Sequence, residues 1–256
     1  MTNSPFIDIS PNLRILGTAH VATASVEAVR HHIAEYQPDI VAVELCKSRH
    51  DALNSDRRLD KEGLLKVVKE GKAPLVLIQS LLAAEQRKLG LDEGQQPGAE
   101  LITAVQEAKA AGLEVALVDR DIQVTLRRAW KNMRFIEKFR VLKSLLAQED
   151  EEEEVPDVNT LLDDSDLLSS LMEELRGFSP GAGKVLIDER DEYLATKLSA
   201  LNSDKKVLAV VGAGHLAGIE EYLVEDKCDI NRVEELQSLP RKTVAMKVMP
   251  WAIPML

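Results

Sequence analysis

Two copies of a Gly-x-x-His motif are the residues of this 256-residue sequence most suited to chemistry. GTAH at residues 17–20 and GAGH at residues 212–215 each directly follow an apolar run that predicts a β-strand. A glycine here lets the backbone turn sharply and leaves room beside the imidazole. Each histidine is therefore expected at the carboxyl end of a strand, where open α/β sheets bind ligands. The alternative is a pair of capping or packed histidines.

Charged side chains are predicted to reach the same edge of the sheet. Glu44 ends the apolar run VAVEL, where an unpaired carboxylate would be costly. Asp119 and Arg120 follow the run EVALV. If the strands run parallel, their carboxyl ends meet, and four metal-ligating side chains converge there: His20, Glu44, Asp119 and His215.

This set of side chains matches a divalent metal site. Two imidazoles with one or two carboxylates can hold a divalent metal and leave positions open for water and substrate. The metal would lower the pKa of a bound water, and a spare carboxylate could act as general base. The alternative is a structural cluster of ion pairs that the same residues make with arginines, namely Arg49, Arg120 and Arg190.

Two other familiar motifs carry less weight. GFSPG at residues 177–181 matches the Gly-x-Ser-x-Gly pattern of serine hydrolases, but it follows a predicted helix, and Pro180 lacks the N–H that an oxyanion hole needs. The glycines of residues 212–218 resemble a dinucleotide-binding loop, but no second strand with an acidic end follows about 20 residues later. A nucleotide-dependent oxidoreductase is therefore the least favoured class.

The composition excludes some classes of protein. With 43 acidic and 32 basic side chains the net charge is −11, which argues against a nucleic-acid-binding protein. Much of the excess lies in residues 149–166, which hold ten Asp or Glu and no Lys or Arg. Cys46 and Cys228 are too few for a disulfide framework. The first residues lack the basic and apolar regions of a secretory signal, so we expect a cytoplasmic domain.

The elements that must position these side chains form an α/β pattern. Short β-branched apolar runs alternate with longer helical stretches, and runs such as IVAVEL are typical of strands that are covered on both faces. We expect a mostly parallel or mixed central sheet that is flanked by helices. The predicted strands are 13–17, 39–45, 75–78, 114–118 and 206–211, and the predicted helices are 25–36, 59–70 and 98–111, the last ending at Gly112.

Residues 121–177 interrupt this alternation with apolar residues at helical spacing. We expect one α/β domain made of residues 1–120 and 178–243, with 121–177 as a helical insertion whose acidic stretch is a solvated bend. Apolar side chains of the insertion would be exposed unless something covers them, which predicts a homodimer through 121–177; packing on the domain's own sheet is the alternative. These side chains include Trp130, Met133, Phe135, Ile136, Phe139 and Leu142.

Residues 244–256 are predicted to be an apolar tail. After Lys247 the sequence reads VMPWAIPML, nine uncharged residues, and a bilayer span needs about 20. The tail is expected either to pack as an edge element or to begin a membrane region that continues beyond Leu256.

Four stretches give the sequence a family resemblance. They are LGTAHVATASVEAVRHHIAEYQPDIVAVELCKSRHDAL, VALVDRDIQVTLRRAW, LIDERDEYLA and VVGAGHLAGI. Their order, from about Leu16 to Gly218, resembles the TraB/PrgY family, to which the Tiki proteases are related and, more distantly, the erythromycin-esterase and ChaN-like proteins. The resemblance implies an α/β sheet domain with two Gly-x-x-His motifs and an active-site glutamate.

The resemblance also implies a chemistry. Tiki members are regarded as divalent-metal-dependent proteases that use manganese or cobalt, and PrgY and TraB members limit peptide pheromones and are membrane-associated. Carried over by motif, the metal ligands are His20, Glu44 and His215, while Arg49 and Arg190 match the arginines of the ELCxxR and ERD motifs. Two features depart from the family pattern: the secretory signal of Tiki proteins is missing, and the acidic insertion has no clear counterpart.

We therefore expect a metal-dependent hydrolase, most specifically a peptidase, with Mn²⁺ or Co²⁺ as the metal and Zn²⁺ as another option. The four converging side chains would hold the metal, with Glu44 as either a ligand or the base that activates water. Arg190 or Arg120 would stabilise the developing oxyanion. The expected partner is a peptide substrate or ligand and not a nucleic acid.

The alternative from another class is a protein that binds a peptide or small ligand without cleaving it. The same pocket would serve, with Arg49 and Arg190 gripping a carboxylate of the ligand and no water activated. A pheromone-limiting role requires only tight binding, so the resemblance is compatible with both hypotheses.

Overall fold

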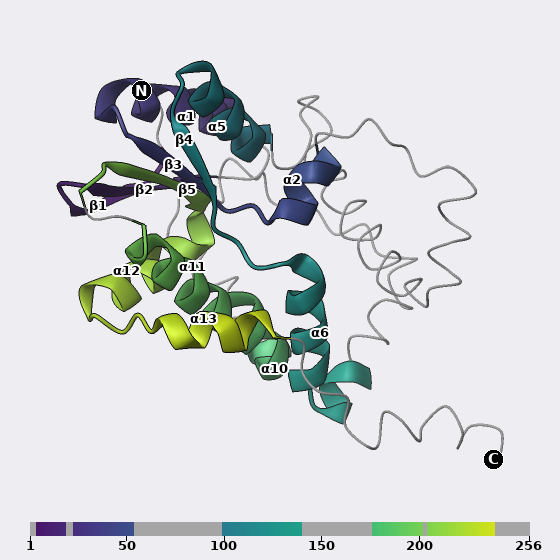
Figure 1. The fold of residues 1–256 in the computed structure, drawn as a ribbon. Helices are drawn as coiled ribbons and strands as arrows, with labels where there is room; N and C mark the ends of the chain where they lie inside the picture. The colour runs from purple at the N-terminus through teal and green to yellow at the C-terminus, as the bar shows by residue number, and fades with distance from the viewer. Residues whose placement is uncertain (1–3, 19–22, 54–98, 140–175, 202–203, 239–256) are drawn as a thin grey trace, which may run out of the picture.

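The computed structural model describes residues 4–18, 23–53, 99–139, 176–201 and 204–238 (Figure 1). Within these ranges a five-stranded sheet has the strand order β1-β2-β5-β3-β4. β1 pairs with β2 antiparallel and the other neighbours are parallel, so the sheet is mixed and the predicted α/β class is confirmed. The strands are β1 (Phe6–Ser10), β2 (Leu13–Thr18), β3 (Ile40–Val43), β4 (Glu114–Leu117) and β5 (Val207–Gly212).

Helices connect and flank these strands (Figure 1). They include a π-helical turn, η2, directly before α11, and a 3₁₀ turn, η3, directly after β5. In the described ranges the labelled helices are α1 (Thr23–Tyr36), α2 (Lys47–Leu53), α5 (Ala99–Ala110), α6 (Ile122–Asn132), α10 (Pro180–Gly183), η2 (Lys184–Asp188), α11 (Glu189–Ser199), η3 (Ala213–His215), α12 (Leu216–Val224) and α13 (Ile230–Gln237).

β5 lies in the middle of the sheet although it comes last in sequence among the described strands. At the carboxyl ends it pairs with β2 through Thr18 and Gly212, and with β3 through Val43 and Val210. β3 pairs in turn with β4 through Val43 and Leu117. Four parallel strands therefore end at one edge, with β5 inserted between β2 and β3. Such a reversal in strand order is where open α/β sheets bind ligands.

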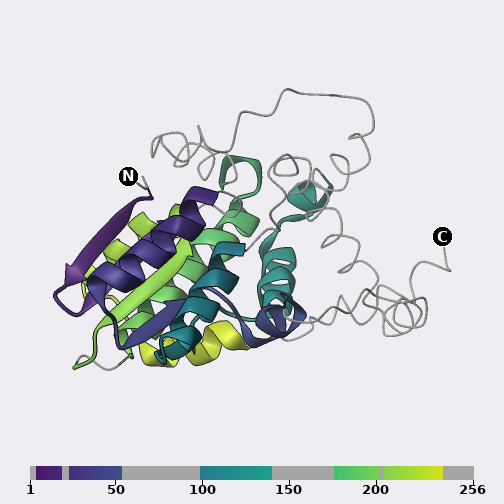
Figure 2. The ribbon, with the colours of Figure 1, turned by 90° about the horizontal axis from the view of Figure 1, so that it is seen from above.

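The central strands are buried on both faces, as their continuous apolar runs predict. Ala209 and Val211 of β5 face the core that α11 and α12 complete. Leu208 and Val210 face the opposite core, which α1 and α5 complete. Figure 2 shows these helices on the two sides of the sheet. The sheet is therefore a rigid central layer that fixes the positions of its strand ends.

Most predicted elements within the described ranges are confirmed. The strands expected at 13–17, 39–45, 114–118 and 206–211 correspond to β2, β3, β4 and β5, and the helices expected at 25–36 and 98–111 correspond to α1 and α5. Gly112 has a φ of 71°, as a glycine that ends a helix requires. β1 was not expected, because an edge strand with an exposed face carries only a short alternating pattern. The strand expected at 75–78 and the helix at 59–70 lie outside the described residues.

The start of the expected insertion is helical and packs on the rest of the protein. α6 buries Thr125 and Ala129, and residues 135–139 form a further helical turn. A Cβ on Gly181 of α10 would lie 2.3 Å from the backbone oxygen of Asn132, so α10 and α6 touch closely. The acidic bend and the apolar tail at 244–256 lie outside the described ranges, and the division into domain, insertion and tail stays a prediction.

None of the helices in the described part of the chain combines the length and apolar character that crossing a bilayer requires.

Candidate functional site

Glu44 directly follows β3 and is 1% exposed. Its Oε2 accepts a hydrogen bond of 2.7 Å from the backbone N–H of Gly212, the last residue of β5. Its Oε1 accepts from Nη2 of Arg190, which lies in the first turn of α11. A carboxylate buried this deeply requires such partners. Glu44 therefore links the carboxyl ends of β3 and β5 to α11.

Arg190 lies at the centre of the polar cluster. Its Nη2 donates to Oδ2 of Asp119 at 3.0 Å, and its Nε to Oδ1 of Asp119 at 3.3 Å. Its Nη1 lies 3.1 Å from Nε2 of His215. Burial opposes the guanidinium charge, yet the neighbouring carboxylates of Asp119 and Glu44 raise the pKa of Arg190. The cluster therefore contains a permanent positive charge.

His215 is held between Arg190 and Asp191. Its Nδ1 lies 2.5 Å from Oδ1 of Asp191. Because a guanidinium has no acceptor, the contact with Arg190 requires Nε2 to be the accepting nitrogen, and Nδ1–H then donates to Asp191. Burial raises the pKa of Asp191, while the hydrogen bond and charge of His215 act in the opposite direction. The imidazole is thus held in one orientation, with Nε2 facing Arg190 and Nδ1 facing Asp191.

Two glycines of the predicted motifs make room for this arrangement. A Cβ on Gly17 would lie 2.4 Å from Cδ1 of Leu216, the residue after His215. A Cβ on Gly218 would lie 2.1 Å from Oδ2 of Asp191. Gly17 therefore lets α12 begin close against β2, and Gly218 leaves the space that the carboxylate of Asp191 occupies.

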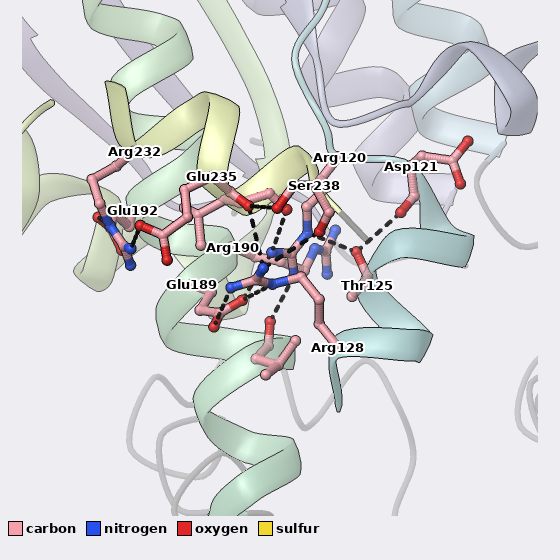
Figure 3. A network of polar contacts seen from close by, with 12 residues as sticks. Arg120, Asp121, Thr125, Arg128, Glu189, Arg190, Glu192, Arg232, Glu235 and Ser238 are labelled. Carbon is pink, nitrogen blue, oxygen red and sulfur yellow. Dashed lines mark hydrogen bonds and ion pairs between the residues drawn. The ribbon is translucent and has the colours of Figure 1, made fainter. Parts of the chain in front are cut away.

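Arg120 belongs to a second network beside the cluster (Figure 3). Its guanidinium is fully buried and donates to Oε2 of Glu189 at 2.9 Å, to Oγ1 of Thr125 at 3.0 Å and to the backbone oxygen of Val185 at 3.1 Å. Arg128 completes a triad with two bonds to Glu189, of 2.8 and 3.0 Å. Arg120 therefore joins the end of β4 to α6, η2 and α11, and its contacts lie outside the cluster around Arg190; its role in stabilising an oxyanion stays a prediction.

Three consecutive residues of α11 serve both networks. Glu189 pairs with Arg120, Arg190 pairs with Asp119, and Asp191 holds His215. The pairs Asp119–Arg190 and Arg120–Glu189 join the end of β4 to the start of α11. The π-helical turn η2 immediately precedes these residues, and such turns are frequent at functional sites.

The predicted metal site can be tested against the donors present. Nε2 of His215 and Oε1 of Glu44 lie 3.8 Å apart, but the guanidinium of Arg190 contacts both and also Asp119. A metal ion here would be repelled by that charge, and no three metal-ligating side chains of the described ranges are grouped to hold one. The described residues of the cluster therefore do not fit a metal ion. The remaining expected ligand, His20, lies outside the described residues.

The sequence prediction found most of this cluster and missed Asp191. Glu44, Asp119, Arg190 and His215 come together as expected. Arg49 lies half-buried on α2, and no contact places it in the cluster. Asp191 stands next to Arg190 in the ERD motif, and no predicted helix or strand covered this stretch to indicate where its side chain points. The glycine of the HLAG segment was the available signal, since a helical glycine often marks a close approach.

The fold and the cluster together define an α/β protein with a buried group of ionisable side chains at the carboxyl edge of its parallel strands. The chain belongs to the TraB/PrgY/gumN family, whose model matches residues 9–229. The resemblance noted in the sequence is therefore confirmed over residues 9–229.

Individual relatives extend this assignment. An uncharacterised protein of Methanocaldococcus jannaschii is 36% identical over 249 residues, which cover 94% of this chain and 61% of the relative. A TraB domain-containing protein of Homo sapiens is 30% identical over 264 residues, which cover 93% of this chain and 69% of the relative. The chain thus spans less than two thirds of the Methanocaldococcus protein.

Proposed function

We propose that this protein is a hydrolase in which His215, oriented by Asp191, takes a proton from the attacking water. The observation that carries the proposal is the 2.5 Å contact between Nδ1 of His215 and Oδ1 of Asp191. It leaves Nε2 as the acceptor on the side of Arg190 and Glu44. A neutral imidazole backed by a carboxylate is the usual arrangement of a general base.

Arg190 would stabilise the charge that develops on the substrate. A carbonyl oxygen that enters the cluster takes the N–H of Nη1, which frees Nε2 of His215 for a water molecule. Nε2 accepts one proton while the water oxygen attacks the carbonyl carbon, and Nη1 binds the resulting oxyanion. The proton then passes from Nε2 to the leaving amine as the C–N bond breaks, and Asp191 stabilises the imidazolium in between.

Glu44 acts in this scheme as a positioning residue. Both of its oxygens accept hydrogen bonds, one from Gly212 and one from Arg190. With Asp119 it holds the guanidinium of Arg190 beside Nε2 of His215. Glu44 as the base or as a metal ligand, which the sequence also suggested, would require it to leave these donors.

The substrate class rests on the family resemblance. The related Tiki proteases cleave peptides, so a peptidase is the specific form of the proposal. Manganese, cobalt or zinc dependence stays a prediction, and the same assay tests it.

The experiment is cleavage of a mixture of unstructured peptides by the purified chain, read by mass spectrometry. We expect new fragments, and we expect His215→Ala and Asp191→Asn to lower their rate of appearance by about 10²–10⁴-fold, the usual contribution of general base catalysis. His31→Ala, at an exposed position of α1, is the matched control and should keep full activity. Chelator treatment followed by addition of Mn²⁺ shows whether the rate depends on a metal.

Two results would overturn the proposal. Full activity in both His215→Ala and Asp191→Asn would exclude the imidazole as the base. Intact peptides that bind measurably to the unaltered chain would instead identify a binding protein, the alternative class that the sequence left open.

A further inference from the structure

One surface of the described residues combines exposed aromatic and basic side chains. It is formed by α6 and the helical turn at 135–139. Its apolar members are strongly exposed, with Trp130 at 43%, Phe135 at 80%, Ile136 at 70% and Phe139 at 63%. We call it the basic–aromatic face, and it consists of Arg127, Trp130, Lys131, Arg134, Phe135, Ile136, Lys138 and Phe139.

Contacts on the inner side of α6 fix which side chains point outward. Thr125 and Ala129 are buried, and Arg128 is bound to Glu189 of the buried triad. Arg127 and Trp130, which are three residues apart, therefore project from the opposite side of the helix. The exposure of this side is a consequence of how α6 is anchored.

The turn at 135–139 is anchored in the same way. Glu137 is buried, and its Oε2 accepts hydrogen bonds from Oγ of Ser179 at 2.7 Å and from the backbone N–H of Gly181 at 3.0 Å. With Glu137 facing inward, Phe135, Ile136 and Phe139 are left on the outside. The exposed aromatic side chains are thus held in place by a buried carboxylate.

The charge of this face is opposite to that of the chain. The whole chain has a net charge of −11, but residues 122–139 contain five Lys or Arg and a single carboxylate, the inward-facing Glu137. Arg127, Lys131 and Arg134 are exposed, and Nζ of Lys138 lies 5.6 Å from the ring centre of Trp130. A charge segregated in this way orients the protein towards an anionic surface.

We propose that the basic–aromatic face docks the protein on an anionic lipid surface. Phe, Trp and Ile side chains enter the boundary between headgroups and acyl chains, and Lys and Arg beside them bind the anionic headgroups. A second copy of this chain is a poorer occupant, because a two-fold dimer would bring the same four cations against each other. The homodimer that the sequence predicted at this segment is therefore an outcome of the test.

The test is sedimentation of the full chain with vesicles. We expect binding to vesicles of mixed phosphatidylcholine and phosphatidylglycerol, weaker binding at high salt, and little binding to pure phosphatidylcholine. Phe135→Ser with Phe139→Ser should abolish the binding. Arg127→Gln and Lys131→Gln should each weaken it roughly fivefold, the effect of one cation at an anionic surface.

Matched controls come from the far side of the fold. Val224 and Ile230 are 67% and 58% exposed on α12 and α13, and Val224→Ser with Ile230→Ser should bind like the unaltered chain. In a Trp251→Phe background the emission of Trp130 should shift to shorter wavelength on binding. Circular dichroism confirms that each variant is folded.

Three outcomes would overturn the inference. One is equal binding of all variants to anionic vesicles, and another is no preference for anionic over neutral vesicles. The third is the absence of lipid binding together with another occupant of the face. This occupant would be a second copy if light scattering shows a dimer that Phe135→Ser with Phe139→Ser splits, or an acidic polypeptide if polyglutamate binds through Arg127 and Lys131.

Discussion

Two adjacent residues of α11, Arg190 and Asp191, set the orientation of the His215 imidazole. Arg190 lies against Nε2 and Asp191 against Nδ1. Because α12 passes close by, the carboxylate of Asp191 fits only where Gly218 has no side chain. The glycine therefore belongs to the site although it carries no chemistry.

We predict that Gly218→Ala disturbs the site through Asp191. The added Cβ would lie 2.1 Å from Oδ2 of Asp191, so the carboxylate or α12 must move. We expect a loss of about 1–3 kcal/mol in the free energy of unfolding, as for other overpacked positions, and a loss of activity similar to that of Asp191→Asn. Gly177→Ala, whose Cβ would meet nothing within 4 Å, should change neither quantity. Activity and urea unfolding that are unchanged in Gly218→Ala would refute this role.

We also predict a pH dependence of stability from Asp191. Because burial raises the pKa of Asp191, the folded state keeps this proton at a pH where the unfolded state has lost it. The stabilisation is complete below the ordinary aspartate pKa and is lost as the pH rises through the raised value. Urea unfolding of Asp191→Asn, measured at increasing pH from the ordinary aspartate pKa upwards, should lack this loss of stability. Parallel curves for the variant and the unaltered chain would contradict it.

At the scale of elements, the triad of Arg120, Glu189 and Arg128 holds α6 and α11 to the end of β4 (Figure 3). Burial opposes the charge of Glu189, but the hydrogen bonds and charges of Arg128 and Arg120 together lower its pKa. Arg128 also donates to the backbone oxygen of Glu235 at 3.2 Å, so the end of α13 joins the same network. These helices are therefore held together by one buried carboxylate.

We predict that Glu189→Gln destabilises the protein by about 3–5 kcal/mol at neutral pH, because it leaves two buried guanidinium groups without their anion. Glu192→Gln on the same helix is the control, since its partner Arg232 is 36% exposed and such a pair is worth about 0–1 kcal/mol. With a lowered pKa, the stabilisation from Glu189 is present above the ordinary glutamate pKa and is lost as the pH falls through the lowered value. Urea unfolding of the two variants across this range measures both effects. Equal stability of the two variants would show that the triad is not a significant anchor.

At the scale of the whole molecule, the two cores on either side of the sheet share β5. Leu208 faces α1 and α5, and Leu194 of α11 faces the opposite core, and both side chains are fully buried. Each face of β5 packs against a different set of helices. Because both cores include β5, loss of packing on one face also destabilises the core on the other face.

We predict that Leu208→Ala and Leu194→Ala each lower the free energy of unfolding by about 2–5 kcal/mol and shift one common transition. Val224→Ala, at a position that is 67% exposed, should change it by less than about 0.5 kcal/mol. Calorimetry distinguishes a single transition from two. Separate transitions, each shifted by only one of the variants, would show that the faces unfold independently.

The sequence by itself determined the local structure and the edge of the sheet at which polar groups gather. Continuous apolar runs identified β3 and β5, because a strand buried on both faces has to be apolar throughout. Shorter apolar runs identified β2 and β4, which are only partly buried. The residues that follow such runs must then lie near the strand ends. Glu44 and His215 are among them. β1 was not identified because its residues alternate between exposed and half-buried, so it has no continuous apolar run.

Only the tertiary structure decided which charges pair. Arg120 and Arg190 each stand beside acidic residues, in DRD and ERD, and the sequence offers no basis for choosing between them. In the fold Arg120 points into the buried triad and Arg190 faces Glu44 and His215, because the start of α11 lies across the end of β4. The contact of Asp191 with His215 likewise depends on packing, because α11 passes close to the start of α12. Pairings of this kind depend on the relative placement of elements far apart in the chain, and local sequence carries no record of that placement.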